Sequence, residues 1–343
     1  MSDLYSEYRV MQIHQDPAVY CVPVPFDDAI ADGVNCFVVI DGDDQLIIDV
    51  GPNTEQACAL WRRVIDDLGL TQPTIFLTHL HADHAGLLET DTFTNPRVIM
   101  SSENYDDYLV KMSNEYLWDL RTKRLREGIP PQEVEELETL VGISYYTDLP
   151  DTVALQFVNE GDVISVGRYS LEVIDTSGHT PGHISLYEPH SKLMFGGDHV
   201  LFVISPVLGT QMGATDVLDV YLKNLRKTSA YNVSLLCHSH GPLIDDGHER
   251  TEWLIAHHLK RIKEGYDIVA AHPGIMGNDL IHGMRWNLRG LTWEQAPAGL
   301  KSCVVESAMV TIDYLVDQGC IRRDERDGIC YYTAQKDFDS LDQ

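Results

Sequence analysis

Short apolar runs rich in β-branched residues dominate the first half of the chain. Residues 34–40 (VNCFVVI) and 45–50 (QLIIDV) flank an Asp-Gly turn, a pattern that predicts a β-hairpin. A helical pattern follows at 54–68 and ends at Gly69. Residues 74–78 (TIFLT) are typical of a buried strand. Further strands are expected at 153–158, 163–166, 169–175, 184–188 and 192–195.

Two other stretches of the chain have helical character. Residues 103–142 are charged and helix-favouring, and they predict two helices broken at 128–131. From about Arg250 the pattern is helical again: residues 292–295 (TWEQ) form a capping-box pattern, and 320–333 predicts a hairpin. We therefore expect an α+β protein with a main domain over 1–249, a helical insertion at about 103–142, and a helical, winged-helix-like C-terminal domain over 250–343.

The charge and the cysteine content indicate which kinds of partner the protein binds and in which compartment it occurs. With 25 basic against 53 acidic residues the formal net charge is -28, so the surface repels nucleic acid and anionic lipid. No apolar stretch reaches the roughly 20 residues of a membrane span, and the N-terminus lacks a secretory pattern. Seven irregularly spaced cysteines are typical of reduced thiols. These features predict a cytoplasmic protein that acts on a small molecule and has no nucleic-acid or membrane partner.

Histidines gather in four short segments of the chain. Eight of the 15 lie in 79–84, 179–183, 198–199 and 238–240, and each segment adjoins a predicted strand and a glycine-marked turn. Loops after strands can aim several side chains at one point. Imidazole and carboxylate groups suit zinc, with manganese or ferrous iron as alternatives. We therefore expect a metal site.

The spacing within these segments predicts two metal ions. His79 and His81 lie two apart on an extended segment, so they share a face and can bind one cation together. Asp83 and His84 follow after a bend and can bind a second cation. A catalytic ion needs roughly three protein ligands and one open position, and Asp198 has two oxygens with which to bridge both ions. The ligand sets are then His79, His81, His179 and Asp198 for one ion, and Asp83, His84, His240 and Asp198 for the other.

Other polar and aromatic residues are expected around these ligands. Asp49 ends an apolar strand, where a buried carboxylate needs a partner, so we expect it to hold a metal-ligating side chain. His183 is expected beside the ligands or in plain packing, and His199, His190 and His238 in the same two roles. The aromatic side chains near the insertion could line a pocket roof or anchor the insertion to the core. They are Tyr105, Tyr108, Trp118, Tyr145 and Tyr146.

The order of these residues resembles the metallo-β-lactamase superfamily over about residues 18–245. The resemblance rests on Asp49, the HxHxDH segment at 79–84, His179 in GHTPGH, Asp198 in GGD and His240 before Gly-Pro. It implies an αββα sandwich, two central sheets flanked by helices, with the metals at one edge. One branch is more similar, the hydroxyacylglutathione-hydrolase-like and lactamase-B2-like proteins with a winged-helix-like C-terminal region. True β-lactamases usually carry a cysteine at the position of Asp198, which argues against that activity.

The expected activity is metal-dependent hydrolysis. Two divalent ions about 3.5–4 Å apart can share a hydroxide that attacks the substrate at neutral pH. Asp83 and Asp198 are the candidate catalytic residues, because either could pass a proton to the leaving group. The acidic surface favours a small ester, thioester or lactone, and the alternative is a metal-dependent phosphodiesterase or ribonuclease on the same site. A di-iron redox member would carry glutamate where His81 stands. The C-terminal domain is expected to wall the site or to form a homodimer.

Overall fold

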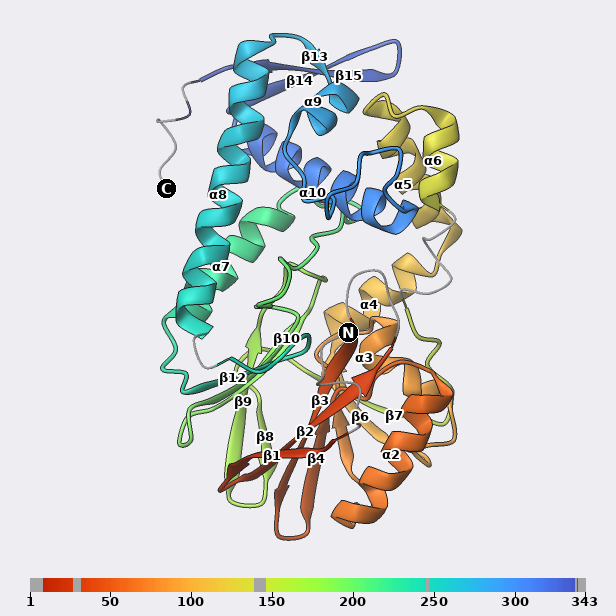
Figure 1. Cartoon of the computed structure of the whole chain (residues 1–343), viewed down its shortest axis with the longest axis vertical. Helices are drawn as coiled ribbons and strands as arrows, with labels where there is room; N and C mark the ends of the chain where they lie inside the picture. Colours follow the sequence, from red (N-terminus) through yellow and green to blue (C-terminus); the bar gives the residue numbers. More distant parts are fainter. Residues whose placement is uncertain (1–8, 27–31, 139–145, 245–246, 337, 339–343) are drawn as a thin grey trace. The chain divides into compact units, whose positions relative to one another are not determined.

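The computed structural model (Figure 1) describes residues 9–26, 32–138, 146–244, 247–336 and 338. The chain forms two compact units. The first comprises Met1–Leu109, Ser144–Pro206 and Asn224–Glu252, and the second comprises Val110–Ile143, Val207–Lys223 and Trp253–Gln343. Most of the helical insertion therefore groups with the C-terminal region, and helix α8 (Gly247–Ala271) runs through the expected boundary at 249–250.

The first unit contains a seven-stranded sheet whose strands follow chain order from β1 to β7. The pairing is antiparallel from β1 to β4 and parallel from β4 to β7. The predicted hairpin is confirmed by β3 and β4, in which Phe37 pairs with Ile48. The strands are Met11–Gln15 (β1), Ala18–Pro25 (β2), Gly33–Asp41 (β3), Asp44–Ile48 (β4), Thr74–Phe76 (β5), Arg97–Ser101 (β6) and Ala154–Val158 (β7).

A second sheet of the same unit has five strands in the order β12-β11-β10-β9-β8. Its one parallel pair is β11 with β12, and the other described pairs are antiparallel. All but the last of these strands were predicted from the apolar pattern. They are Val163–Val166 (β8), Tyr169–Asp175 (β9), Ile184–Glu188 (β10), Leu193–Gly197 (β11) and Leu235–His238 (β12).

Helix α2 (Glu55–Leu68) confirms the predicted helix and its end signals. The Thr54 side chain accepts a hydrogen bond from the backbone N–H of Ala57, which satisfies one free donor of the first turn. Gly69 ends the helix in the left-handed conformation with φ 62°, which a side chain would disfavour. The helix lies along the seven-stranded sheet (Figure 1). Its Trp61 is fully buried in the core that it shares with the sheet.

Alternation along β3 separates two apolar cores. Cys36 and Val38 face α2, while Phe37 faces the five-stranded sheet, because successive strand side chains point to opposite faces. Between the sheets, Phe37 and Phe195 on β11 meet edge to face with ring centroids 5.6 Å apart. The end of α7 (Val217–Ser229) lies against the residues that follow β11, since Thr228 hydrogen-bonds His199. These layers fix the strand ends from which the candidate ligands project.

The region 102–138 contains three helices where two were predicted. They are α4 (Ser102–Lys111), α5 (Asn114–Arg126) and α6 (Pro131–Glu138). The predicted break at 128–131 is confirmed. The additional break was missed because Ser113, which caps α5 by accepting from the Tyr116 N–H, resembles an ordinary polar helix residue in the sequence.

The C-terminal part of the second unit contains helices and a small sheet, as the sequence indicated. Helices α9 (Gly277–Gly283) and α10 (Ala298–Asp317) accompany a three-stranded sheet in the order β13-β15-β14. Its strands are Ile275–Met276 (β13), Ile321–Arg326 (β14) and Ile329–Ala334 (β15). The helix start predicted at the capping box is wrong: Thr292 and Gln295 close a turn on each other, and α10 begins only at Ala298.

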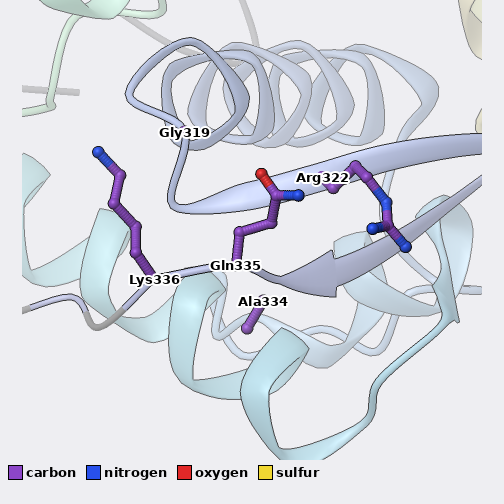
Figure 2. A pocket seen from close by; sticks show the side chains of 5 residues that line it. All are labelled: Gly319, Arg322, Ala334, Gln335 and Lys336. Carbon is purple, nitrogen blue, oxygen red and sulfur yellow. The ribbon is translucent and has the colours of Figure 1, made fainter.

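A shallow hollow of about 530 Å³ lies at the base of the β14–β15 hairpin (Figure 2). Its lining side chains diverge: Figure 2 shows Arg322 and Lys336 pointing away from each other. The guanidinium of Arg322 is already paired with the Asp324 carboxylate at 2.9 Å. Among the described residues, none of the helices has both the length and the apolar composition that a membrane-spanning segment needs.

We predict that Phe195→Ala lowers the free energy of unfolding of the first unit by about 3–5 kcal/mol, because it leaves a cavity between the two sheets. Urea unfolding followed by circular dichroism measures the change. Val163→Ala, at a side chain that is 57% exposed, serves as the control and should cost far less. Equal losses in the two variants would show that the sheets do not pack through Phe195.

Candidate metal centre

The candidate ligands lie in segments that directly follow strands of the first unit. They are His79 and His81 after β5, Asp83 and His84 in helix α3 (Ala82–Ala85), His179 between β9 and β10, Asp198 after β11, and His240 after β12. The structure brings all seven together: their ligand atoms form three overlapping groups, and the atoms of each group lie within 4.8 Å of one another. Rigid strand ends can hold side chains at such separations.

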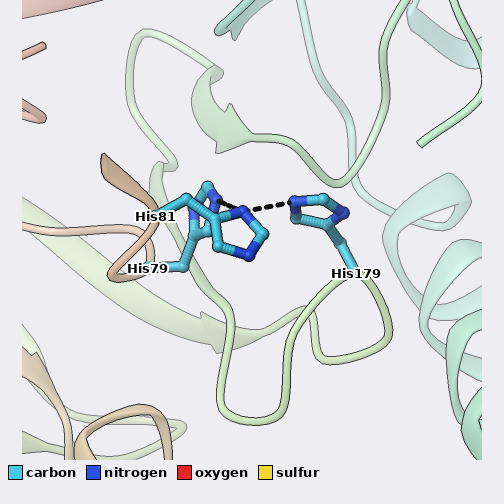
Figure 3. A group of neighbouring side chains, drawn as sticks. All are labelled: His79, His81 and His179. Carbon is cyan, nitrogen blue, oxygen red and sulfur yellow. Dashed lines mark hydrogen bonds between the residues drawn. The ribbon is translucent and has the colours of Figure 1, made fainter. Parts of the chain in front are cut away.

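Three imidazoles form the first group (Figure 3). Nε2 of His79 lies 3.0 Å from Nδ1 of His81, and Nε2 of His179 lies 3.0 Å from the same atom. Figure 3 shows these rings converging from two separate segments of the chain. One ring nitrogen carries at most one proton, so His81 cannot donate to both neighbours at once. A cation among the three would be bound by their lone pairs.

The second group consists of His84, His240 and Asp83. Oδ2 of Asp83 lies 3.4 Å from Nε2 of His240 and 3.7 Å from Nε2 of His84. The Asp83 side chain is 27% exposed, whereas His84 is fully buried. This group therefore combines two enclosed imidazoles with one carboxylate that solvent can reach.

Asp198 lies between the two groups. Its Oδ1 is 3.5 Å from Nε2 of His84 and 3.4 Å from Nε2 of His240. Its Oδ2 is 3.5 Å from Nε2 of His179. The two oxygens thus face different groups, which is the arrangement that a bridging carboxylate requires.

Asp49 orients one candidate ligand directly and another through Thr78. Its Oδ2 accepts hydrogen bonds from Nδ1 of His84 and from Oγ1 of Thr78, each at 2.8 Å. The Thr78 hydroxyl in turn accepts from Nδ1 of His79 at 3.0 Å. With a metal ion bound, each of these imidazoles would keep its proton on Nδ1 and turn Nε2 toward the cluster as the ligand atom.

His240 and His183 have similar bonds but different roles. Nδ1 of His240 donates to the Gly33 carbonyl at 2.8 Å, which again leaves Nε2 for the cluster. Nε2 of His183 instead accepts from the backbone N–H of Asp198 at 3.2 Å, and its Nδ1 donates to Thr176 Oγ1 at 2.7 Å. His183 therefore holds the main chain at Asp198 and is absent from the three ligand groups found among the described residues.

The sequence also matches a family model, described as the metallo-beta-lactamase superfamily, over residues 29–240. The match covers more than half of the chain and includes all seven candidate ligands. The chain belongs to the metallo-beta-lactamase superfamily.

Two proteins with similar sequences are named as hydrolases. "Probable metallo-hydrolase YqjP" of Bacillus subtilis (strain 168) is 29% identical over 238 residues, which are 66% of this chain and 72% of that protein. Hydroxyacylglutathione hydrolase GloC of Haemophilus influenzae is 31% identical over 169 residues, 49% of this chain and 66% of GloC. Both are named as hydrolases, and this chain is an enzyme of that class.

A solved structure shares the fold. The crystal structure of a beta-lactamase domain protein from Burkholderia ambifaria aligns with a TM-score of 0.81 and 22% identity, covering 97% of this chain and 96% of that one. The two-sheet fold that the family resemblance implied is thereby confirmed for the first unit.

The carboxylates in the cluster of candidate ligands attract positive charge strongly. Burial lowers the pKa of His79 well below its usual range, and nearby imidazoles lower it further. Burial acts in the same direction at His84, but the carboxylates of Asp83, Asp198 and Asp49 outweigh it and raise that pKa to about 10. Burial alone would raise the pKa of Asp198, yet the His240 and His84 imidazoles hold it well below its usual range. Protons and metal ions compete for such a cluster.

Two buried atoms of the cluster support a cation there. Nε2 of His84 and Oδ1 of Asp198 find no hydrogen-bond partner among the described residues. A buried polar atom without a partner costs free energy, so native proteins rarely leave one unsatisfied. Both atoms are of the types that bind divalent metals, and both face the centre. The residues present therefore fit the metal ions that the superfamily implies.

The aromatic candidates occupy different places. The Tyr146 ring lies 5.2 Å from the His81 ring, and the two residues form an isolated β-bridge. Tyr105 and Tyr108 pack into the core beneath α2, which suits an anchoring role for the helix that carries them. Trp118 belongs to the second unit, where its side chain is 72% exposed. Tyr145 lies outside the described residues.

Three buried polar residues that support the candidate ligands were not predicted from the sequence. Thr78, Asn35 and Asn104 are buried, and each hydrogen-bonds a ligand or the loop that carries one. The signal for Asn35 is present in the sequence, because an amide within the apolar run VNCFVVI needs a buried partner. Neither Thr78 nor Asn104 stands out in this way.

We predict that Asp49→Asn weakens metal binding by about 10–100-fold. The amide nitrogen of asparagine would donate to Nδ1 of His84, which moves the imidazole proton to Nε2, the atom that faces the cluster. Competition with a chromophoric chelator measures the affinity. The control is Asp41→Asn, a carboxylate that pairs with Arg168 and not with a ligand. Unchanged affinity in Asp49→Asn would contradict the assigned role.

Proposed function

We propose that this chain is a hydrolase that binds two divalent metal ions, with Zn²⁺ the best-suited, and cleaves a small ester, thioester or lactone. The carrying observation is the position of Asp198: its Oδ1 lies near His84 and His240, and its Oδ2 lies near His179. The first ion would be held by His79, His81, His179 and Asp198, and the second by Asp83, His84, His240 and Asp198.

The ligand chemistry supports zinc. Imidazole nitrogens and carboxylate oxygens are its common ligands outside cysteine sites. Each ion would have three ligands of its own and share Asp198, and zinc can expand to five-coordinate, which would leave a position for water or substrate. When bound, a pair of such ions lowers the pKa of water and polarises the oxygen of the bond to be cleaved. The chain itself supplies neither a serine nor a cysteine nucleophile in this proposal.

Asp83 is the residue best placed to move a proton. Its Oδ2 lies beside His84 and His240, and the carboxylate could take a proton from the attacking water. Because its side chain is 27% exposed, it can then deliver the proton to a leaving group. Asp198 is 8% exposed, so we assign it mainly to orientation and charge.

Charge and relatives support an acyl substrate. The net charge of -28 opposes the approach of a polyanion such as RNA, so a neutral or cationic small molecule is favoured. One relative is named a hydroxyacylglutathione hydrolase, which acts on an acyl compound. The seven irregularly spaced cysteines support a reducing, cytoplasmic setting for the same proposal.

We predict that complete metal removal abolishes hydrolysis of acyl esters, thioesters or lactones, and that added Zn²⁺ restores it. Asp198→Ala should lower kcat/KM by at least about 100-fold with the fold retained, since it removes a group shared by both ions. A substrate panel with phosphodiesters and RNA checks the class, and Asp67→Ala on the exposed face of α2 is the control. Acyl activity that survives in metal-free protein would overturn the proposal. Cleavage of phosphodiesters alone would replace the substrate class with the alternative one.

A further inference from the structure

The loop that carries His179 is held by a side chain from another element. Nδ2 of Asn104, in the first turn of α4, donates to Oγ1 of Thr180 at 3.0 Å and to the Pro181 carbonyl at 2.8 Å. These two bonds use both hydrogens of the amide. Asn104 is 1% exposed, so water does not compete for them. The bonds fix the backbone directly after His179.

The same loop fits closely against the start of α4. Gly182 has φ 63°, and a Cβ there would lie 2.4 Å from the backbone nitrogen of Asn104 and 2.5 Å from Oγ of Ser101. Only glycine allows so close an approach at this conformation. The second glycine of GHTPGH thus serves the docking of the loop on α4, and it belongs to the same contact as Asn104.

A second asparagine holds the loop that carries His240. Nδ2 of Asn35 on β3 donates to the Gly241 carbonyl at 2.8 Å and to the His238 carbonyl at 3.2 Å. The backbone N–H of Asn35 also donates to the Ser239 carbonyl at 2.6 Å. Asn35 is 1% exposed. Its contacts enclose His240 from both sides along the chain.

We propose that Asn104 and Asn35 are positioning residues that hold the two halves of the metal centre separately. Asn104 orders the loop that carries His179 and so sets the affinity for the first ion. Asn35 orders the loop that carries His240 and so sets the affinity for the second ion. This inference rests on the two-ion site of the proposed function, and it assigns to each ion its own support.

Each ligand loop needs support from outside because its own backbone restricts it little. Both ligand loops contain glycines of positive φ, Gly178 and Gly182 in one and Gly241 in the other, so their backbones are intrinsically permissive. An uncharged amide restricts such a loop without adding a charge beside the cations. Groups that orient metal ligands from outside typically change metal affinity by about 10–100-fold.

A double-mutant cycle on metal affinity tests the proposal without relying on activity. Zn²⁺ binding is measured by chelator competition for Asn104→Ala alone, and in His179→Ala and His240→Ala backgrounds. We expect about a 10-fold loss from Asn104→Ala in the wild-type and His240→Ala backgrounds, and less than about a 2-fold loss in the His179→Ala background. Asn35→Ala should show the reverse pattern. The visible spectrum of the Co²⁺-loaded variants should change in the same pairwise way.

Controls separate positioning from general destabilisation. The variant Tyr187→Phe loses the hydroxyl that donates to the Asn232 carbonyl. Because Asn232 lies in a loop that carries no candidate ligand, this variant should lower stability without changing Zn²⁺ affinity. If Asn104→Ala fails to fold, Asn104→Leu fills a similar space without a donor and takes its place. Equal losses from Asn104→Ala in the two histidine backgrounds would overturn this inference while leaving the two-ion site intact. A wild-type chain that binds no Zn²⁺ would instead overturn the proposed function.

Discussion

The crowding of imidazole ring nitrogens is the constraint on which the rest of the site depends. Nε2 of His79 and Nε2 of His179 both lie 3.0 Å from Nδ1 of His81, at a spacing where one proton cannot serve both contacts. Nε2 of His84 and Oδ1 of Asp198 are buried beside them without a hydrogen-bond partner. Such an arrangement is costly unless positive charge occupies the centre. The carboxylates attract that charge, and imidazole and carboxylate groups of this kind are common ligands of divalent metal ions.

Hydrogen bonds transmit this constraint from the centre into the two sheets. Asp49 follows β4 and holds His84, and Thr78 follows β5 and holds His79. The Gly33 carbonyl at the start of β3 holds His240. Each of these partners lies at a strand end whose own position is set by the apolar core between the sheets and beneath α2. Packing and chemistry are therefore coupled: a shifted strand would turn a ligand away from the centre.

The sequence revealed what local spacing can encode. The apolar runs predicted the β3–β4 hairpin and α2. The spacing of His79 with His81, and of Asp83 with His84, predicted two pairs that the structure does bring together. Partners that meet only in the folded chain could not be predicted in this way. Asn104 and Thr180 are 76 positions apart, and their contact depends on how α4 docks. Local rules also failed where tertiary packing decides, as at Thr292, whose capping pattern closes a turn and begins no helix.

The most direct test of the account is an anomalous-scattering map at the zinc edge from crystals of the Zn²⁺-loaded protein. Two peaks should flank the Asp198 carboxylate. One should lie among the ring nitrogens of His79, His81 and His179, and the other beside His84, His240 and Asp83. A single peak, or zinc bound only elsewhere on the chain, would contradict the claim that these side chains form one two-ion centre.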